Sequence, residues 1–327
     1  YGDILKAINE AMEGKHFEEF KDIDYLPEKL GKRVLTTGGH FGYLKIAEGC
    51  DKHCTYCIIP KLRGKFRSVP MERLIEQAKE MAEEGVKELI LVAQETTVYG
   101  TDIYGKKSLH VLLKELCEIK GIRWIRVLYC YPEEIYDELI QTMKEEKKIC
   151  HYLDIPIQHA SDRILKRMGR RTSKQELIDK IDFLRSEMPD ITLRTTLITG
   201  FPGETKEQHK ELLEFINDME FDRLGVFTYS PEEGTPAARM LNRVDTEEAQ
   251  RRAELVMEIQ TQVMDEFNDS RMGDPVEVLC DGYDVQAMSY VGRSYAESPG
   301  IDGGIFFTAE RDVEPGDFVM VRITGAM

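Results

Sequence analysis

The chain has 327 residues, 42% of them hydrophobic, and a formal net charge of −16 at pH 7. This length is sufficient for about two domains and a sizeable core. No apolar run approaches the roughly 20 residues that a membrane-spanning helix needs, so we expect a cytoplasmic protein with no membrane partner. The strong negative charge argues against nucleic acid as the main partner and favours a basic one.

Residues 1–40 are expected to connect the chain to a preceding N-terminal domain. The apolar residues Ile4, Leu5, Ile8 and Met12 follow helical spacing, and a polar, acidic stretch comes after them. The chain starts without a Met and enters this helical pattern directly. We therefore expect it to be a piece of a longer protein.

Residues 41–245 show strands that alternate with helices. Six strands are predicted at residues 43–47, 88–93, 124–128, 152–157, 192–199 and 224–228. The intervening helices are predicted near residues 70–84, 108–118, 133–146, 161–167, 173–187 and 205–219. Because such alternation is typical of parallel β/α winding, we predict an α/β fold built as a partial (β/α)6 barrel. The active site of such a barrel forms where its strands end.

The composition changes in the last quarter of the chain. A charged helix predicted at residues 246–270 is expected to carry the chain away from the barrel. Residues 271–327 contain short alternating runs between glycine turns and no helical pattern. About five short strands in such a segment predict a small antiparallel β-barrel of OB-like size.

The most informative stretch contains three cysteines with CxxxCxxC spacing, Cys50, Cys54 and Cys57, directly after the first predicted strand. Three thiolates can hold a [4Fe-4S] cluster and leave one iron without a protein ligand. An open iron can chelate a cofactor, and in radical S-adenosylmethionine (SAM) enzymes it binds the amino and carboxylate groups of SAM. We therefore predict an iron–sulfur cluster that cleaves SAM reductively.

A structural zinc ion is the alternative, with His53 or His40 as its fourth ligand. Zinc sites usually use two pairs of ligands separated by a longer insert, and the sequence contains no second pair. The remaining cysteines are Cys117, Cys130, Cys150 and Cys280. Their single spacing indicates buried thiols of a reducing compartment.

Polar side chains near the predicted strand ends are candidates for SAM binding. Tyr56 could cover the adenine, although it could also be an ordinary packing aromatic. Gln94 and Glu95 could hold the ammonium group by charge-assisted hydrogen bonds, and a solvated loop is their alternative. Gln158 and Arg194 could contact the carboxylate or ribose, or form a structural polar pair.

Residues 199–205 read as a strand end, a glycine turn and a helix start, with Thr205 and Gln208 spaced as a capping box. The turn at Gly200 and Phe201 could bring the backbone close to the adenine, or could serve only the helix start. Two basic segments are interpreted as solvated charge runs, and each could also offset cluster charge or guide a substrate. They are Lys61, Arg63, Lys65 and Arg67, and Lys166, Arg167, Arg170 and Arg171.

Taken together, these motifs resemble the radical-SAM methylthiotransferases over nearly the whole chain from residue 43. The matching segments are residues 50–64, 94–96, 156–160, 200–205 and 229–235. The resemblance implies that Cys50, Cys54 and Cys57 hold the cluster and that Ile58 joins the SAM contacts. It also implies a TRAM domain at residues 271–327. One departure is Val69, where the family often has an arginine.

Two branches of this family compete. One modifies an adenosine of tRNA, and the other, the RimO branch, modifies the β-carbon of an aspartate in small-subunit ribosomal protein number twelve. Three segments resemble the RimO branch, namely residues 158–160, 195–196 and 290–303. The charge of residues 271–327 supports this choice, because four basic and ten acidic residues give a net charge of −6. An RNA-binding module should be basic, whereas an acidic one suits a basic ribosomal protein, so we expect the acidic TRAM domain to contact the substrate protein.

The resemblance implies that a 5'-deoxyadenosyl radical takes a hydrogen atom from the aspartate β-carbon. A methylthio group then couples there, a second SAM supplies the methyl, and an external electron donor is required. In this family the sulfur is handled at a second [4Fe-4S] cluster in an N-terminal domain, which we expect to be absent from this chain. We predict that the chain cleaves SAM without completing methylthiolation. The alternatives are a tRNA methylthiotransferase and a zinc-stabilised module that binds RNA or the ribosome.

Overall fold

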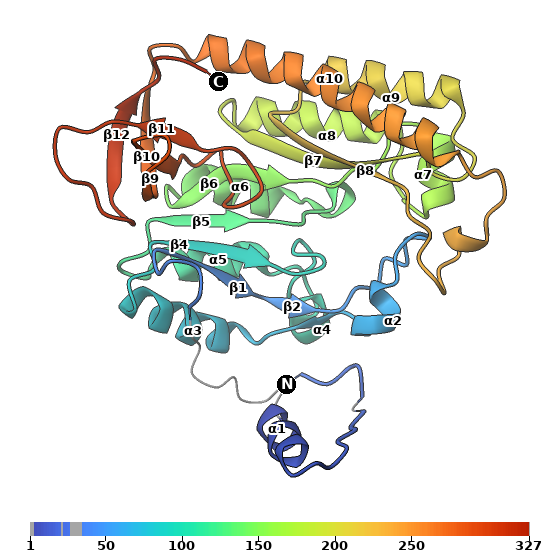
Figure 1. Cartoon of the computed structure of the whole chain (residues 1–327), viewed down its shortest axis with the longest axis horizontal. Helices are drawn as coiled ribbons and strands as arrows, with labels where there is room; N and C mark the ends of the chain where they lie inside the picture. Colours follow the sequence, from blue (N-terminus) through green and yellow to red (C-terminus); the bar gives the residue numbers. More distant parts are fainter. Residues whose placement is uncertain (1–2, 21, 27–34, 327) are drawn as a thin grey trace.

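The computed structural model describes residues 3–20, 22–26 and 35–326. Helix α1 (Ile4–Met12) confirms the predicted N-terminal helix, and it lies apart from the body of the molecule (Figure 1). Residues 1–2, 21 and 27–34 of the predicted connector, which spans residues 1–40, lie outside the described residues. In the described part of the chain, no helix is long and apolar enough to cross a membrane.

Six parallel strands form the main sheet, as predicted for a partial (β/α)6 barrel. They are β1 (Phe41–Lys45), β4 (Glu88–Val92), β5 (Trp124–Val127), β6 (Ile149–Asp154), β7 (Thr192–Thr199) and β8 (Arg223–Thr228). Their order in the sheet is β1-β4-β5-β6-β7-β8. Strand β6 begins and ends three residues earlier than the predicted strand. Pro156 has no N–H for a sheet ladder, which explains why the strand does not extend to residue 157.

Helices cover the outer face of this sheet (Figure 1). They are α3 (Met71–Glu83), α5 (Leu109–Cys117), α6 (Asp137–Glu145), α7 (Asp162–Met168), α8 (Lys174–Glu187) and α9 (Lys206–Met219). Apolar side chains on the outer face of the strands, such as Leu44, Leu91 and Leu193, are fully buried beneath them. Each such side chain contributes about 1.5 to 3 kcal/mol when it leaves water.

Several short elements supplement these helices. Strands β2 (Ala47–Glu48) and β3 (Arg67–Ser68) form a small ribbon next to the cysteines. Helices α2 (Ile59–Arg63) and α4 (Thr101–Tyr104) and the 3-10 turns at Pro132–Glu134 and Ala237–Arg239 have no counterpart in the predicted elements. The capping box that the sequence predicts at α9 is confirmed, because Thr205 Oγ1 accepts from Gln208 N at 3.3 Å.

The long charged helix is confirmed as α10 (Thr246–Ser270), but it does not carry the chain directly away from the barrel. It packs along β8, β7 and α9 and thereby extends the helical layer (Figure 1). Ala249, Ala253 and Val256 are buried on the packed face, which explains why this face is apolar in an otherwise charged helix.

The C-terminal sheet contains four antiparallel strands in the order β11-β10-β9-β12. They are β9 (Pro275–Asp284), β10 (Ser289–Arg293), β11 (Ile305–Phe307) and β12 (Phe318–Arg322). This sheet lies beside the N-terminal ends of the barrel strands, opposite the end that carries β2 and α2 (Figure 1). The ring of Phe318 packs edge-on against Trp124, the first residue of β5, with the ring centroids 4.8 Å apart.

Buried ion pairs fasten the two sheets together. Glu88 of β4 accepts from Arg126 Nε at 2.8 Å and from Arg293 Nη1 of β10 at 2.7 Å. Arg293 also donates to Asp281, which His40 Nε2 contacts at 2.8 Å. The Glu88 and Arg126 side chains are fully buried. A charge in such a place is stable only when it is paired, so these contacts specify how the sheets dock.

Candidate iron–sulfur and cofactor site

The three cysteines of the CxxxCxxC motif lie on a loop at the C-terminal end of the barrel. Cys50 and Cys54 are buried and Cys57 is half-buried, and all three are free thiols. Burial raises the pKa of the Cys50 thiol to about 11. Three unpaired thiols close in sequence, two of them shielded from water, form a suitable donor set for an iron–sulfur cluster.

Backbone contacts hold the cysteine loop in place. Thr55 N donates to Met168 O at 2.9 Å at the end of α7, and Ala237 N donates to Thr55 O at 2.9 Å. Gly49, directly before Cys50, has φ +79°, and a Cβ there would lie 2.0 Å from the Lys65 carbonyl oxygen. A side chain at this position would therefore displace either the loop or the β2–β3 ribbon.

Two lysines and two carboxylates surround the loop. Lys52 Nζ contacts Glu134 Oε1 and lies 3.9 Å from Glu95 Oε2. Lys107 Nζ pairs with Glu134 Oε2 at 2.8 Å. Glu134 is thus paired with both lysines. Burial raises the pKa of Glu134, but the two lysines lower it more, so its pKa lies below the usual value.

Glu95 is 1% exposed, and its two oxygens differ. Oε1 accepts from Thr97 N at 3.0 Å and from the Thr97 hydroxyl, whereas Oε2 has no hydrogen-bond partner among the described residues. Burial raises the pKa of this carboxyl to about 7, although Thr97 and Lys52 oppose the shift. A buried carboxylate oxygen without a donor is costly for the protein alone, and a cationic ligand group would satisfy it.

Tyr131 contacts this loop and Arg170 contacts Tyr131, but neither is among the predicted site residues. The Tyr131 hydroxyl lies 3.6 Å from Cys54 Sγ, and the Arg170 guanidinium lies 4.2 Å from the centre of the Tyr131 ring. Arg170 is 6% exposed, so the interpretation of its basic segment as a solvated charge run is wrong at this position. Tyr131 follows the third predicted strand. The expectation that site residues lie just after the strands, which selected Gln94, would therefore have selected Tyr131 as well.

Tyr56 lies at the edge of an aromatic group. Its ring is 6.5 Å from that of Phe201, edge to face, and Phe201 is 5.3 Å from Tyr229. Phe201 is fully buried, whereas Tyr56 is half-buried. Phe201 therefore packs behind Tyr56 and supports its ring. Of these two aromatic residues, Tyr56 has exposed surface that a ligand could cover.

The two predicted glutamines differ in environment. Gln94 Nε2 lies 3.4 Å from Glu48 Oε1, and its own Oε1 is buried without a partner among the described residues. Gln158 has φ +72° and bridges to β7, where its backbone N–H donates to Thr196 O at 2.9 Å. Left-handed backbone at a non-glycine residue is uncommon and is often found where a side chain is held for function.

Arg194 has partners within the protein. Its Nη1 donates to Asp154 Oδ1 at 2.8 Å, and its Nε lies 3.4 Å from Asp302 Oδ1 in the C-terminal domain. These contacts agree with the alternative interpretation of Arg194, in which it forms polar pairs that stabilise the fold and does not contact SAM.

The glycine turn after β7 also has a role within the chain. Gly200 has φ +71°, and a Cβ there would lie 2.4 Å from the Ala249 Cβ of α10. The close approach at this position is therefore made by α10. Glu204, at the end of the turn, accepts from the Gly200 N–H and lies 3.7 Å from His159 Nε2 and 3.4 Å from Arg252 Nη1.

The structure places the two candidate fourth ligands of the zinc alternative, His40 and His53, differently. His40 precedes β1, at the opposite end of the strand from the cysteines, and is bonded to Asp281. His53 is exposed on the loop. Among the residues that the structure describes, no three His, Cys, Asp or Glu side chains form a group that could hold a single metal ion.

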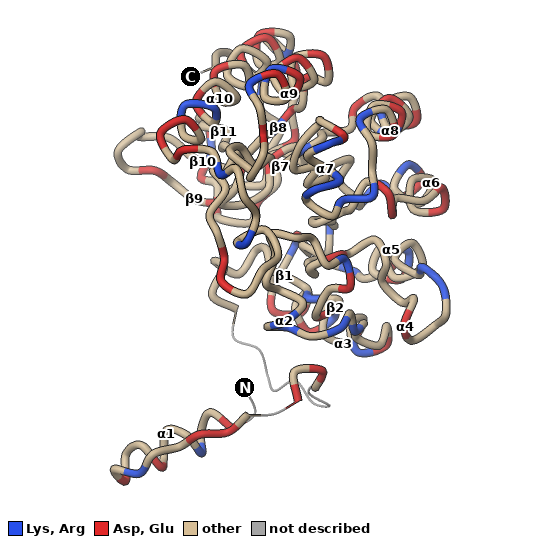
Figure 2. Tube along the Cα trace, turned by 90° about the vertical axis from the view of Figure 1, so that its right-hand side faces the viewer, with Lys and Arg blue, Asp and Glu red and all other residues tan. Residues whose placement is uncertain are grey.

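Basic residues are present at the cysteine end of the barrel. Figure 2 views the molecule from this end and shows Lys and Arg on α2 and α7, whereas Asp and Glu are frequent on α9 and α10. Arg67, from the first basic segment, is not free, because its Nη1 donates to Asp24 at 3.0 Å and thereby fastens the connector.

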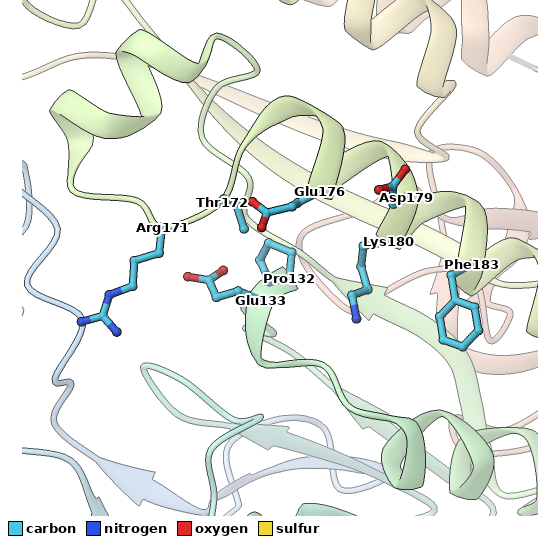
Figure 3. A pocket seen from close by; sticks show the side chains of 8 residues that line it. All are labelled: Pro132, Glu133, Arg171, Thr172, Glu176, Asp179, Lys180 and Phe183. Atoms are coloured by element: carbon cyan, nitrogen blue, oxygen red, sulfur yellow. The ribbon is translucent and has the colours of Figure 1, made fainter.

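A pocket of about 400 Å³ lies beside this end of the barrel, between the turn after β5 and helix α8. Its lining includes Glu133, Arg171 and Lys180, and Figure 3 shows Arg171 reaching away from the α8 side chains. None of the three cysteines lines it.

Comparisons with known proteins agree with this site. Residues 44–216 match the model of the radical SAM superfamily, and residues 272–327 match that of the TRAM domain. Among solved structures, coproporphyrinogen III oxidase (HemN) from Escherichia coli aligns with a TM-score of 0.51 at 18% identity, covering 68% of this chain and 52% of that chain. The methyltransferase TsrM from Kitasatospora setae aligns with a TM-score of 0.50 at 14% identity, covering 60% and 38%. These two show a shared fold.

Curated relatives are much more similar. The chain is 57% identical over 326 residues to ribosomal protein uS12 methylthiotransferase RimO of Lachnoclostridium phytofermentans, covering 100% of this chain and 74% of the relative. It is 46% identical to the protein of the same name from Clostridioides difficile, covering 100% and 73%. The chain therefore belongs to the RimO family of radical-SAM methylthiotransferases.

Proposed function

We propose that this chain provides the radical-SAM chemistry for adding a methylthio group to the β-carbon of an aspartate in ribosomal protein uS12. The observation that carries the proposal is the loop with three free cysteines at the C-terminal end of a parallel partial barrel. When bound, the cluster and SAM supply a 5'-deoxyadenosyl radical, which can take a hydrogen atom from an unactivated carbon.

The residues of the site take distinct roles in this proposal. Cys50, Cys54 and Cys57 hold the cluster. Glu95 accepts from the SAM ammonium group through Oε2, which lies 3.9 Å from Lys52 Nζ and has no hydrogen-bond partner among the described residues. Tyr56 covers the adenine, and Phe201 supports its ring from behind.

Three other residues contribute more indirectly. Ile58 provides apolar surface after the third cysteine, and Gln158 presents its side chain from a strained backbone position. Gly200 allows α10 to approach the turn that carries Phe201. We do not assign a SAM contact to Arg194, because Asp154 and Asp302 already surround its guanidinium.

We also propose that the acidic C-terminal domain helps to attract the basic substrate protein. Four of its ten acidic residues face the barrel and are paired there, namely Glu277, Asp281, Glu297 and Asp302. The exposed ones are Asp274, Glu310, Asp312 and Glu314. Because this domain lies at the opposite end of the barrel from the cysteines, we assign it to long-range attraction, which acts on the association rate.

The cluster and SAM chemistry are tested with the chain itself. After anaerobic reconstitution, about four irons with sulfide per chain are expected, whereas about one zinc would support the structural module. With SAM and a one-electron reductant, the chain should release 5'-deoxyadenosine and methionine. Replacing Cys54 by Ala should abolish this release. Iron uptake without SAM cleavage would contradict the proposed reaction.

The substrate is tested by offering uS12 and tRNA together to the complete enzyme of Lachnoclostridium phytofermentans and to this chain. Mass spectrometry should find the methylthio group on an aspartate of uS12 with the relative, and no methylthio product with this chain alone. A methylthio adenosine in tRNA would favour the alternative branch. A methylthio product from this chain alone would contradict the expectation that a further part of the protein is required.

A further inference from the structure

Tyr131 connects the cysteine loop to a buried arginine. Its hydroxyl lies 3.6 Å from Cys54 Sγ, and the Arg170 guanidinium covers its ring at 4.2 Å. Lys52 Nζ lies 5.0 Å from the same ring. Cation–π contacts of this kind are worth about 2 kcal/mol when they are desolvated, so the ring is held firmly in place.

Arg170 is unusual among the basic residues of its segment. It is 6% exposed, whereas its neighbour Arg171 is exposed at the pocket beside α8 (Figure 3). Its Nη2 donates to Pro156 O at 3.0 Å and lies 3.9 Å from Glu133 Oε2. The Nε and Nη1 groups have no partner among the described residues. A buried guanidinium that is only partly paired costs free energy, so the fold alone does not explain why it is there.

We propose that Tyr131 and Arg170 are positioning residues that raise the reduction potential of the cluster held by Cys54 and its two neighbours. This inference rests on the proposed function, because it requires a cluster on the three cysteines. Tyr131 donates a hydrogen bond to the Cys54 thiolate. Arg170 fixes the Tyr131 ring and places a positive charge behind it.

The direction of the effect follows from charge. Reduction adds one negative charge to the cluster and its thiolates. A hydrogen bond to a ligating sulfur and a nearby buried cation both stabilise the more negative state, and hydrogen bonds to sulfur are known to set cluster potentials. Low dielectric in this buried region strengthens both contributions.

The neighbouring charges do not remove the effect. Lys52 is also positive, and its two carboxylate neighbours, Glu95 and Glu134, lie on its side of the loop. Glu133 is the carboxylate near Arg170, and its Oε2 lies 3.9 Å from Nη2, beyond hydrogen-bond distance, so it offsets the guanidinium charge only in part. On the side of Tyr131 that faces the segment after α7, the Arg170 guanidinium therefore remains the nearest charge, 4.2 Å from the ring centre.

The test is a redox titration of the reconstituted chain, followed by electron paramagnetic resonance. Tyr131→Phe keeps the ring and removes only the hydroxyl. At a fixed solution potential it should lower the ratio of reduced to oxidised cluster about tenfold, the size expected for one hydrogen bond to a charged group. Arg170→Gln should shift the midpoint in the same direction, and Arg170→Lys should shift it less because the charge remains.

Arg171→Gln is the matched control, because it removes an adjacent but exposed charge, and its midpoint should equal that of the unaltered chain. Iron and sulfide content must match among the variants compared. If Tyr131→Phe and Arg170→Gln carry full clusters at the unaltered midpoint, the inference is wrong while the proposed function stands. If the unaltered chain takes up no iron, the proposed function fails and this inference with it.

Discussion

Arg194 of β7 and Asp302 of the C-terminal domain lie 3.4 Å apart, measured from Nε to Oδ1. Asp302 Oδ2 also accepts from the Tyr152 hydroxyl at 2.7 Å and from Ser298 N at 2.9 Å. A single carboxylate thus joins two barrel strands to a loop of the C-terminal domain. The C-terminal domain is fastened by buried polar contacts, which explains how it can keep one orientation although the docked surface is rich in charge.

Replacing Asp302 by Ala should therefore destabilise the whole chain. The Asp302 side chain is 3% exposed, and its loss leaves the Tyr152 hydroxyl and part of the Arg194 charge without a partner. We expect the free energy of unfolding to fall by about 3 to 5 kcal/mol, as when one partner of a buried pair is removed. Urea denaturation measures this. Asp312→Ala, an exposed acid of the same domain, should change stability by less than about 0.5 kcal/mol, and equal effects would contradict the role of Asp302.

The contact between Gly200 and Ala249 leads to a second prediction. Gly200→Ala adds a Cβ at 2.4 Å from the Ala249 Cβ and also places a side chain at φ +71°. We expect a loss of about 2 to 4 kcal/mol in the free energy of unfolding from overpacking and backbone strain together. In an Ala249→Gly background the loss should be smaller, because only the strain remains. A double-mutant cycle measures the difference, and simple additivity would show that the two residues do not clash.

The barrel could be predicted from the sequence because its strands are short apolar runs that alternate regularly with amphipathic helices. The cysteine spacing likewise predicted the site, because it is local. The surroundings of Arg170 could not be predicted in this way. Four basic residues in six positions are usually solvated, and the contact with Tyr131 joins residues 39 apart in sequence. The burial of Arg170 depends on how α7 packs against the loop after β5.

A third prediction concerns pH. Although burial opposes it, contacts with His159, His209 and Arg252 lower the pKa of Glu204 from 4.5 to about 2. A carboxyl whose pKa is depressed on folding contributes stability above its unfolded value, and this contribution is lost as the pH falls toward the folded value. Glu204→Gln should therefore lower the free energy of unfolding by about 3 kcal/mol at pH 7.

The difference between Glu204→Gln and the unaltered chain should shrink as the pH falls from about 5 toward 3. Urea denaturation at several pH values measures both chains. Glu211→Gln, a change at a more exposed position of α9, the helix that follows Glu204, should keep a constant small difference across this range. Parallel curves for Glu204→Gln and the unaltered chain would show that Glu204 is not the group that titrates.

A fourth prediction separates SAM binding from folding at Glu95. Gln can still accept from Thr97 but cannot provide the charge, so Glu95→Gln should raise the dissociation constant for SAM at least about tenfold. Because burial raises the pKa of Glu95 to about 7, the substitution should not reduce the stability of the cofactor-free chain at pH 8. Calorimetry on the reconstituted chain measures binding. Glu134→Gln removes the charge next to Lys52 and should weaken SAM binding less than Glu95→Gln does. Equal effects of the two substitutions would indicate that Lys52, and not Glu95, determines SAM binding.

The role of Arg194 illustrates a further limit of sequence analysis. Its place on β7 suggested a cofactor contact, and the partner that the sequence could not reveal is Asp302, which is 108 residues away. The position of the C-terminal domain at the opposite end of the strands is set by Trp124, Glu88 and Arg293, whose contacts join residues far apart in the sequence. The net charge of −6 counted from the sequence of residues 271–327 also includes carboxylates that face the barrel and are paired with its basic residues, so the exposed surface is less acidic than this count suggests.

The most direct measurement follows a hydrogen atom. The reconstituted chain is incubated with SAM, a reductant, tRNA and uS12 deuterated at the β-carbons of its aspartates, and the released 5'-deoxyadenosine is analysed by mass spectrometry. The account predicts that deuterium appears in 5'-deoxyadenosine, and that it is lost when Cys54 is replaced by Ala. Release of 5'-deoxyadenosine without deuterium, in an assay where the Lachnoclostridium relative transfers it, would contradict the proposal that this site acts on the aspartate of uS12.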